Sequence, residues 1–116
     1  MTKTVLFVYG TLKRKFDNHY LLERSKYLGN GYTKSKYALY ERGIPFVIKD
    51  EQVSVIYGEL YEISDKTLKQ LDRLENHPHW YCREQVEIIT ETGKSILAWL
   101  YFYPEPNGKL NTTGLY

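Results

Sequence analysis

The segment from Ser95 to Tyr103 constrains the fold most, because both sets of its alternating residues are apolar. The two sets are Leu97, Trp99 and Tyr101 on one side of an extended chain, and Ile96, Ala98 and Leu100 on the other. A strand with two apolar faces needs cover on both of them. The segment is therefore expected to be a central strand of a sheet.

A hairpin is predicted immediately before this strand. Residues Tyr81–Thr90 form a second strand pattern, and Glu91-Thr92-Gly93-Lys94 between the two is a glycine-containing turn of the hairpin kind. The run Thr4–Tyr9 is β-branched and aromatic, stops at Gly10, and predicts a strand buried on both faces.

Further elements are expected along the rest of the chain. Strands are predicted over Tyr32–Tyr40 and Val53–Ile63, with a bulge at Gly58, and short helices over Asp17–Ser25 and Asp65–Glu75. Turns are predicted at Gly29–Gly31 and Arg42–Pro45, and the tail from Pro104 is expected to wrap over the surface.

Composition narrows the fold class. The chain has 116 residues, which is one domain, residues 1–116. It contains 12 tyrosines but two alanines, which argues against an all-helical bundle. Antiparallel hairpins with two short helices predict an α+β domain whose sheet is curled or closed.

The charge pattern excludes several classes of partner. A net charge of +2 is too balanced to indicate nucleic-acid or membrane binding, and Lys13-Arg14-Lys15 reads best as a solvated loop. The single Cys82 leaves no intramolecular disulfide and fits a reducing compartment. The apolar run Val5–Val8 is too short for a signal segment or a membrane span, so a cytoplasmic protein is expected.

Glu75 occupies an unusual position on the helix predicted to begin at Asp65. With Leu68 at 0° on a helical wheel, Leu71 falls near 300° and Glu75 near 340°, inside the apolar stripe. Burial and the C-terminal end of the helix dipole would both raise the pKa of this carboxyl, which suits a general base. Two other interpretations stay open: the helix ends early and Glu75 reaches water, or Glu75 pairs with Arg73 or Arg83.

Other chemical patterns are weaker. Gly10-Thr11-Leu12 follows a buried strand, where backbone N–H groups can bind a carboxylate or an oxyanion. Glu75, His77, His79 and Cys82 fall within eight residues, but their spacing matches no usual zinc pattern. Cys82 is more typical of a buried structural thiol than of a nucleophile, and His19 is expected at the surface.

Two segments resemble a known family. Val8-Tyr9-Gly10-Thr11-Leu12-Lys13-Arg14 with Asn18-His19, and Leu71 to Arg83 with its L-D-x-x-E helix end, proline turn and Tyr-x-Arg, are similar to the two signatures of γ-glutamylcyclotransferase-like proteins. The resemblance is strongest to the γ-glutamylamine cyclotransferase branch. One departure is Lys15, where relatives often have glycine.

The resemblance implies a small mixed β-barrel with two short helices and no cofactor or metal. It implies that Glu75 is the catalytic acid/base and that Tyr9, Gly10, Thr11 and Leu12 hold the γ-glutamyl moiety. Tyr81 would line the pocket, and Tyr101 is a further candidate. The implied reaction is intramolecular: the α-amine of a small γ-glutamyl amide attacks its γ-carbonyl, which forms 5-oxoproline and releases an amine.

The sequence is also compatible with two other functions. One is a binding protein that keeps the γ-glutamyl pocket without turnover. The other is a weak RNA-binding barrel, which would require a basic stripe that the sequence does not show beyond residues 13–15. The identity of the leaving amine and the oligomeric state are not indicated by any motif.

Overall fold

A curled sheet with one helix across its end makes up the part of the chain that the computed structural model describes, which is residues 4–10, 13, 22, 25–75, 77, 79–106 and 108–116. The elements of these residues are β1 (Thr4–Val8), β2 (Lys26–Thr33), β3 (Ala38–Arg42), β4 (Ile44–Ile48), β5 (Tyr57–Ile63), α1 (Asp65–Leu74), β6 (Cys82–Thr90), β7 (Ser95–Phe102) and β8 (Lys109–Asn111). The expected α+β class is confirmed.

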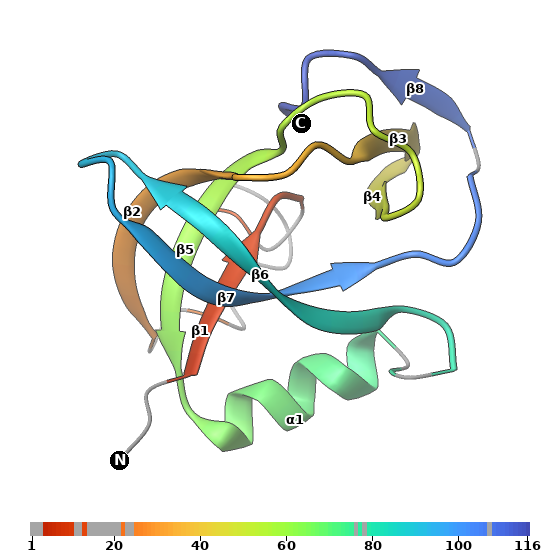
Figure 1. Cartoon of the computed structure of the whole chain (residues 1–116). Helices are drawn as coiled ribbons and strands as arrows, with labels where there is room; N and C mark the ends of the chain where they lie inside the picture. The colour runs from red at the N-terminus through yellow and green to blue at the C-terminus, as the bar shows by residue number, and fades with distance from the viewer. Residues whose placement is uncertain are drawn as a thin grey trace.

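The eight described strands form one mixed sheet in the order β1-β5-β2-β6-β7-β4-β3-β8. Most pairs are antiparallel, but β7 also pairs in parallel with β1, at Leu6 and Trp99, and with β4, at Val47 and Phe102. Figure 1 shows the sheet curling so that β1 lies beside β7, with α1 beneath the sheet in this view. As expected, β7 is therefore a central strand.

The core has two clusters, which lie on opposite faces of β1 and β7. From β1, Leu6 and Val8 enter one cluster together with Leu71 of α1, while Phe7 enters the other. From β7, Tyr101 joins the α1 side; Ala98, Leu100 and Phe102 join the other cluster. The two apolar faces predicted for each strand thus have separate partners.

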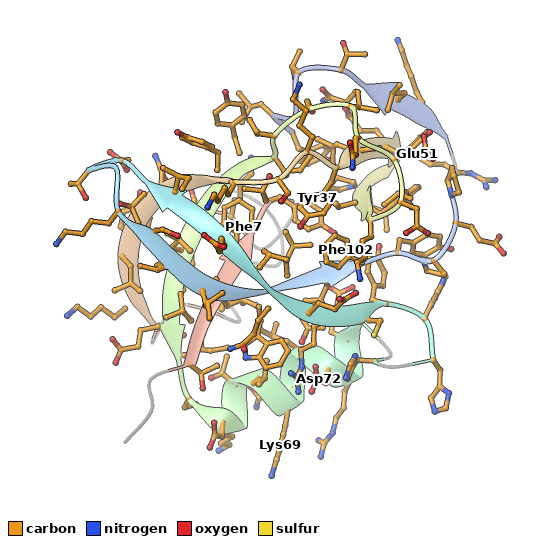
Figure 2. The ribbon with its side chains drawn as sticks, viewed as in Figure 1. Phe7, Tyr37, Glu51, Lys69, Asp72 and Phe102 are labelled. Carbon is orange, nitrogen blue, oxygen red and sulfur yellow. The ribbon has the colours of Figure 1, made fainter. Side chains whose placement is uncertain are left out.

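The helix and the hairpin closely follow their predicted ranges. Ser64 caps α1, its Oγ accepting a hydrogen bond of 3.1 Å from the backbone N–H of Thr67. In Figure 2, Lys69 points away from the sheet and Asp72 lies on the side facing it. Strands β6 and β7 pair from Cys82 with Phe102 to Ile89 with Ser95.

The prediction of a turn at Gly29–Gly31 is wrong, because these residues lie inside β2. The pairing of β2 with β5 shifts between Tyr27 and Gly29, and Gly29 adopts a φ of 115°, so the glycine forms a bulge rather than a chain reversal. The predicted strand Tyr32–Tyr40 is consequently divided between the end of β2 and β3.

The Arg42–Pro45 bend is in fact the tip of a full hairpin between β3 and β4. The strand expected from Val53 begins only at Tyr57, and the tail adds a short strand, β8, that pairs with β3. Gly58 is not at a bulge, since pairing of β5 continues through it; a Cβ there would lie 2.3 Å from the carbonyl oxygen of Val8.

One helix, α1, is present among the described residues. The second predicted helix, residues 17–25, lies outside them except for Leu22 and Ser25, as does His19. No helix in the described part of the chain is long and apolar enough to cross a membrane.

Candidate functional site

A pocket of about 350 Å³ opens where α1 ends, beside the C-terminal end of β1 and the β3–β4 hairpin. Its walls come from five separate stretches of the chain and are largely aromatic or aliphatic. The lining residues are Phe7, Val8, Tyr9, Gly10, Arg42, Ile44, Pro45, Phe46, Leu74, Glu75, Trp80, Tyr81, Tyr101 and Tyr103. Among them, Arg42 is the only basic side chain, and Glu75 is the only carboxylic acid.

Glu75 reaches this pocket from the C-cap of α1. Its backbone N–H donates to the carbonyl of Leu71 at 2.9 Å, and its own carbonyl accepts from the N–H of Tyr81 at 3.1 Å. These two bonds fix the helix end and the returning chain around the side chain. Burial raises the pKa of the Glu75 carboxyl from its ordinary 4.5 to about 7.

Neither of the other interpretations of Glu75 fits this geometry. The helix extends to Leu74, and Glu75 keeps helical backbone angles. Arg83 pairs with Asp72 instead, and Arg73 is exposed. Within the described ranges, no side chain forms an ion pair or hydrogen bond with the Glu75 carboxylate, whose raised pKa has burial as its cause.

Tyr9 and Gly10 bring the end of β1 to the pocket. The Tyr9 hydroxyl is buried and donates a 2.9 Å hydrogen bond to the backbone carbonyl of Tyr101. Burial, followed by the charges of Tyr81 and Glu75, raises the pKa of Tyr9 well above its usual value. At Gly10, a Cβ would lie 2.5 Å from Cγ of Pro45, so glycine allows the β3–β4 hairpin to approach.

The other two predicted tyrosines complete the surroundings of Glu75. Tyr81 is buried and meets Tyr103 edge-to-face at 5.1 Å between ring centroids. The Tyr101 hydroxyl donates a 2.7 Å hydrogen bond to Oδ1 of Asp72. Burial raises the pKa of both phenols, and the charge of Glu75 raises both further.

The structure thus gathers five of the seven predicted site residues, Tyr9, Gly10, Glu75, Tyr81 and Tyr101, around one pocket. Thr11 and Leu12 lie outside the described residues. The roles assigned to all seven stay predictions.

Sequence reasoning missed one part of the pocket and one carboxylate beside it. The first is an aromatic wall in which Tyr103 contacts Phe46 at 4.9 Å and Trp80 at 6.0 Å between ring centroids. Phe46 was missed because the β3–β4 hairpin was interpreted as a bend. The second is Asp72, which the helical wheel placed at the margin of the apolar stripe; its position three residues before Glu75 was the available signal.

The weaker chemical patterns do not converge at this site. The expectation of a buried thiol is wrong, because Cys82 is exposed at the first residue of β6. His79 is exposed too, and Nδ1 of His77 accepts from the backbone N–H of Arg83 at 3.3 Å. Among the described residues, no three His, Cys, Asp or Glu side chains come together as metal ligands would. Lys13, expected in a solvated loop, is instead 7% exposed, and its Nζ donates to the Tyr116 carbonyl at 2.6 Å.

Comparison with known proteins places this arrangement in context. A family model described as "Gamma-glutamyl cyclotransferase, AIG2-like" matches residues 6–116. A Methanocaldococcus jannaschii protein named "Putative gamma-glutamylcyclotransferase" is 52% identical over 112 residues, which are 96% of this chain and 93% of that protein.

Solved structures show the same likeness. An AIG2-like protein from Mus musculus has a TM-score of 0.79 at 29% identity, with 88% of this chain and 78% of the mouse chain covered. An uncharacterised protein from Pyrococcus horikoshii has a TM-score of 0.76 at 27% identity, with 97% and 88% covered.

Proposed function

This chain belongs to the AIG2-like gamma-glutamyl cyclotransferase family, and from that membership and the pocket around Glu75 we propose that it converts a small γ-glutamyl amide to 5-oxoproline and a free amine. The observation that carries the proposal is Glu75 itself. Its carboxyl lies in a largely apolar pocket, unpaired among the described residues, with a pKa of about 7. The proposal also takes the curled sheet as a small mixed barrel with a second short helix over residues 17–25.

The proposed reaction needs a group that both accepts and returns a proton. Glu75 takes a proton from the substrate α-ammonium, and the resulting amine attacks the γ-carbonyl carbon to form the new C–N bond. The bond to the leaving nitrogen then breaks as that nitrogen is protonated by Glu75. The two protons lost by the attacking nitrogen are the two that turn the leaving amide nitrogen into an ammonium ion, so the reaction is balanced.

A pKa near 7 suits this exchange, because a base is most effective when its pKa lies near the working pH. An ordinary glutamate would accept the proton poorly, while a permanently neutral one could not accept it at all. The nucleophile is part of the substrate, so the pocket mainly has to hold the γ-glutamyl chain folded on itself. In ideal intramolecular reactions, such proximity contributes up to about 7–11 kcal/mol.

The remaining site residues have binding roles in this proposal. Tyr9, Gly10, Thr11 and Leu12 hold the γ-glutamyl moiety, and their backbone N–H groups bind either its carboxylate or the developing oxyanion. The rings of Tyr81 and Tyr101 enclose the folded chain. The tight approach of Gly10 to Pro45 supports the proposal, because it leaves backbone rather than side chain at the pocket surface.

The test is an assay of 5-oxoproline formed from γ-glutamyl amines and γ-glutamyl dipeptides. We expect the wild-type protein to turn over at least one of them, and Glu75→Gln to reduce the rate by roughly 10²–10⁴-fold. Glu105→Gln is the matched control, because Glu105 is an exposed carboxylate outside the pocket. Full activity of Glu75→Gln in an active preparation would contradict the role of Glu75.

The same protein preparation also distinguishes catalysis from the rival function, binding without turnover. A protein that binds without turnover would form no 5-oxoproline from any substrate, yet 5-oxoproline or a γ-glutamyl amide would raise its melting temperature. An active protein that loses activity through Glu75→Gln excludes that alternative.

A further inference from the structure

Asp72 is the centre of a hydrogen-bond network next to the proposed site. Its Oδ1 accepts from Nε of Arg83 at 2.8 Å and from the hydroxyl of Tyr101 at 2.7 Å, and its Oδ2 accepts from Nη2 of Arg83 at 3.2 Å. One carboxylate therefore binds a guanidinium in bidentate fashion and a phenol as well, an arrangement that combines strength with fixed geometry.

Arg83 is held in this position from several sides. Its guanidinium stacks on the ring of Trp99 at 4.2 Å, and its backbone N–H donates to His77. Arg83 is directly opposite Tyr101 in the β6–β7 pairing, so both side chains project from the same face of the sheet, toward Asp72. About four-fifths of each charged side chain is buried, which makes the pair more than a surface ion pair.

Glu75 lies one helical turn beyond Asp72, on a neighbouring part of the same face. The titratable and charged groups that share its pocket are Tyr9 from β1, Arg42 from β3, Tyr81 before β6, and Tyr101 and Tyr103 at the end of β7. Within the described part of the chain, none of these groups donates a hydrogen bond to the Glu75 carboxylate.

Two hydroxyl groups of this pocket donate their hydrogen bonds elsewhere. The Tyr9 hydroxyl is bound to the backbone carbonyl of Tyr101, and the Tyr101 hydroxyl is bound to Asp72. Arg83, the cation on the same sheet face as Tyr101, is also bound to Asp72. We propose that Asp72 is a positioning residue that keeps the Tyr101 hydroxyl and the Arg83 guanidinium away from Glu75, so that neither of them donates to the Glu75 carboxylate.

The catalytic part of this inference rests on the proposed function, but the effect of Asp72 on the protonation of Glu75 can be measured without enzyme activity. Burial pushes the pKa of Asp72 up, yet the hydrogen bonds from Arg83 and Tyr101 outweigh burial, and the net pKa is lowered. Asp72 is therefore ionised at neutral pH and balances the charge of Arg83. Without that balance, Arg83 and the freed phenol would stabilise the Glu75 carboxylate and make it a weaker base.

The experiment follows the Glu75 carboxyl carbon by ¹³C NMR during a pH titration of the protein without substrate. In Asp72→Asn the midpoint is expected to fall by roughly one to three pH units, the range for a carboxylate that gains a nearby cation. In the double variant Asp72→Asn/Arg83→Gln the cation is absent, so the midpoint should return toward the wild-type value. Asp50→Asn, an exposed aspartate outside the pocket, is the matched control and should leave the midpoint unchanged.

If Asp72→Asn does not fold, the single variant Arg83→Gln still tests the inference. This variant leaves Asp72 negative without its cation, so the Glu75 midpoint should move to higher pH. An unchanged midpoint in Asp72→Asn would overturn the inference, and a double variant that stays shifted as far as Asp72→Asn would overturn the part of it that concerns Arg83. In the active enzyme, the acidic limb of the kcat/KM profile should move with the NMR midpoint.

The two proposals fail in different ways. Absence of 5-oxoproline with any substrate would refute the proposed function, but the NMR midpoints would still report on Asp72. An active enzyme whose Glu75 midpoint ignores Asp72 and Arg83 would refute only the positioning role.

Discussion

Glu75→Gln is expected to stabilise the folded chain above neutral pH, although it should remove activity. The reason is the raised pKa of Glu75, about 7 in the folded chain against an ordinary 4.5. A group that holds its proton more tightly when folded makes the folded state less favourable once the solution removes that proton. Glutamine has nearly the same shape and never ionises, so it avoids this penalty.

The magnitude follows from the two pKa values. One pKa unit corresponds to about 1.36 kcal/mol, so the difference between 4.5 and about 7 gives an upper bound of about 3 kcal/mol. The pocket is open to solvent, which screens the charge, and we therefore expect about 1–2 kcal/mol. For a domain of 116 residues this corresponds to a melting temperature higher by roughly 4–8 °C.

The stability difference between Glu75→Gln and wild type depends on pH, and the variant should be the more stable protein at high pH. Below about pH 4.5, Glu75 is protonated in both states, and its raised pKa leaves the free energy of unfolding unaffected. Between pH 4.5 and 7 the unfolded chain releases the proton while the folded chain keeps it, and wild-type stability falls relative to the variant. Above pH 7 the full penalty is present.

Urea unfolding of wild type and Glu75→Gln at pH 4 and pH 8 measures this difference. The gain should appear at pH 8 and be nearly absent at pH 4. Glu105→Gln, which removes an exposed carboxylate, should show no comparable difference between the two pH values. A glutamine variant that is no more stable than wild type at pH 8 would refute burial as the cause of the raised pKa.

Three further substitutions test the scaffold around the site. Gly10→Ala places a Cβ 2.5 Å from Cγ of Pro45, which should push the β3–β4 hairpin outward and raise KM severalfold in the 5-oxoproline assay. Gly58→Ala places a Cβ 2.3 Å from the carbonyl oxygen of Val8, a backbone atom that cannot move freely, and should lower the free energy of unfolding by about 1–3 kcal/mol in urea. Ser64→Ala removes the N-cap of α1 and should lower it by about 1 kcal/mol, with unchanged KM.

Elements with strong local signals could be predicted from the sequence. α1 has its cap and its apolar stripe within one continuous segment, and the β6–β7 hairpin has two strand patterns joined by a glycine turn. The bulge in β2 and the β3–β4 hairpin could not be predicted in the same way. Gly29 and the Arg42–Pro45 segment have the composition of turns, and only pairing with β5 and β4 makes their flanking residues strands.

The residues of the candidate site also differ in how strong their local sequence signals are. Glu75 was found because a carboxylate inside an apolar stripe is visible on a helical wheel, and the loop after β1 because of its resemblance to a family signature. Phe46 carries no such local mark, and Arg83, although it belongs to the Tyr-x-Arg segment, was considered only as a partner of Glu75 and not of Asp72. They reach the site through strand pairing between distant segments, which no spacing within one element records.

The pocket combines the hydrogen-bonded hydroxyls of Tyr9 and Tyr101 with one carboxylate that has no donor among the described residues. Tyr9 donates to the Tyr101 carbonyl, the Tyr101 hydroxyl donates to Asp72, and Asp72 also binds Arg83, so these three donors are bonded within the scaffold. A chain selected for stability alone would lose free energy by leaving Glu75 in that position, since a donor or an apolar side chain there would be more favourable. In the proposed reaction, the α-ammonium of the substrate enters the pocket and donates to this carboxylate, which then accepts its proton.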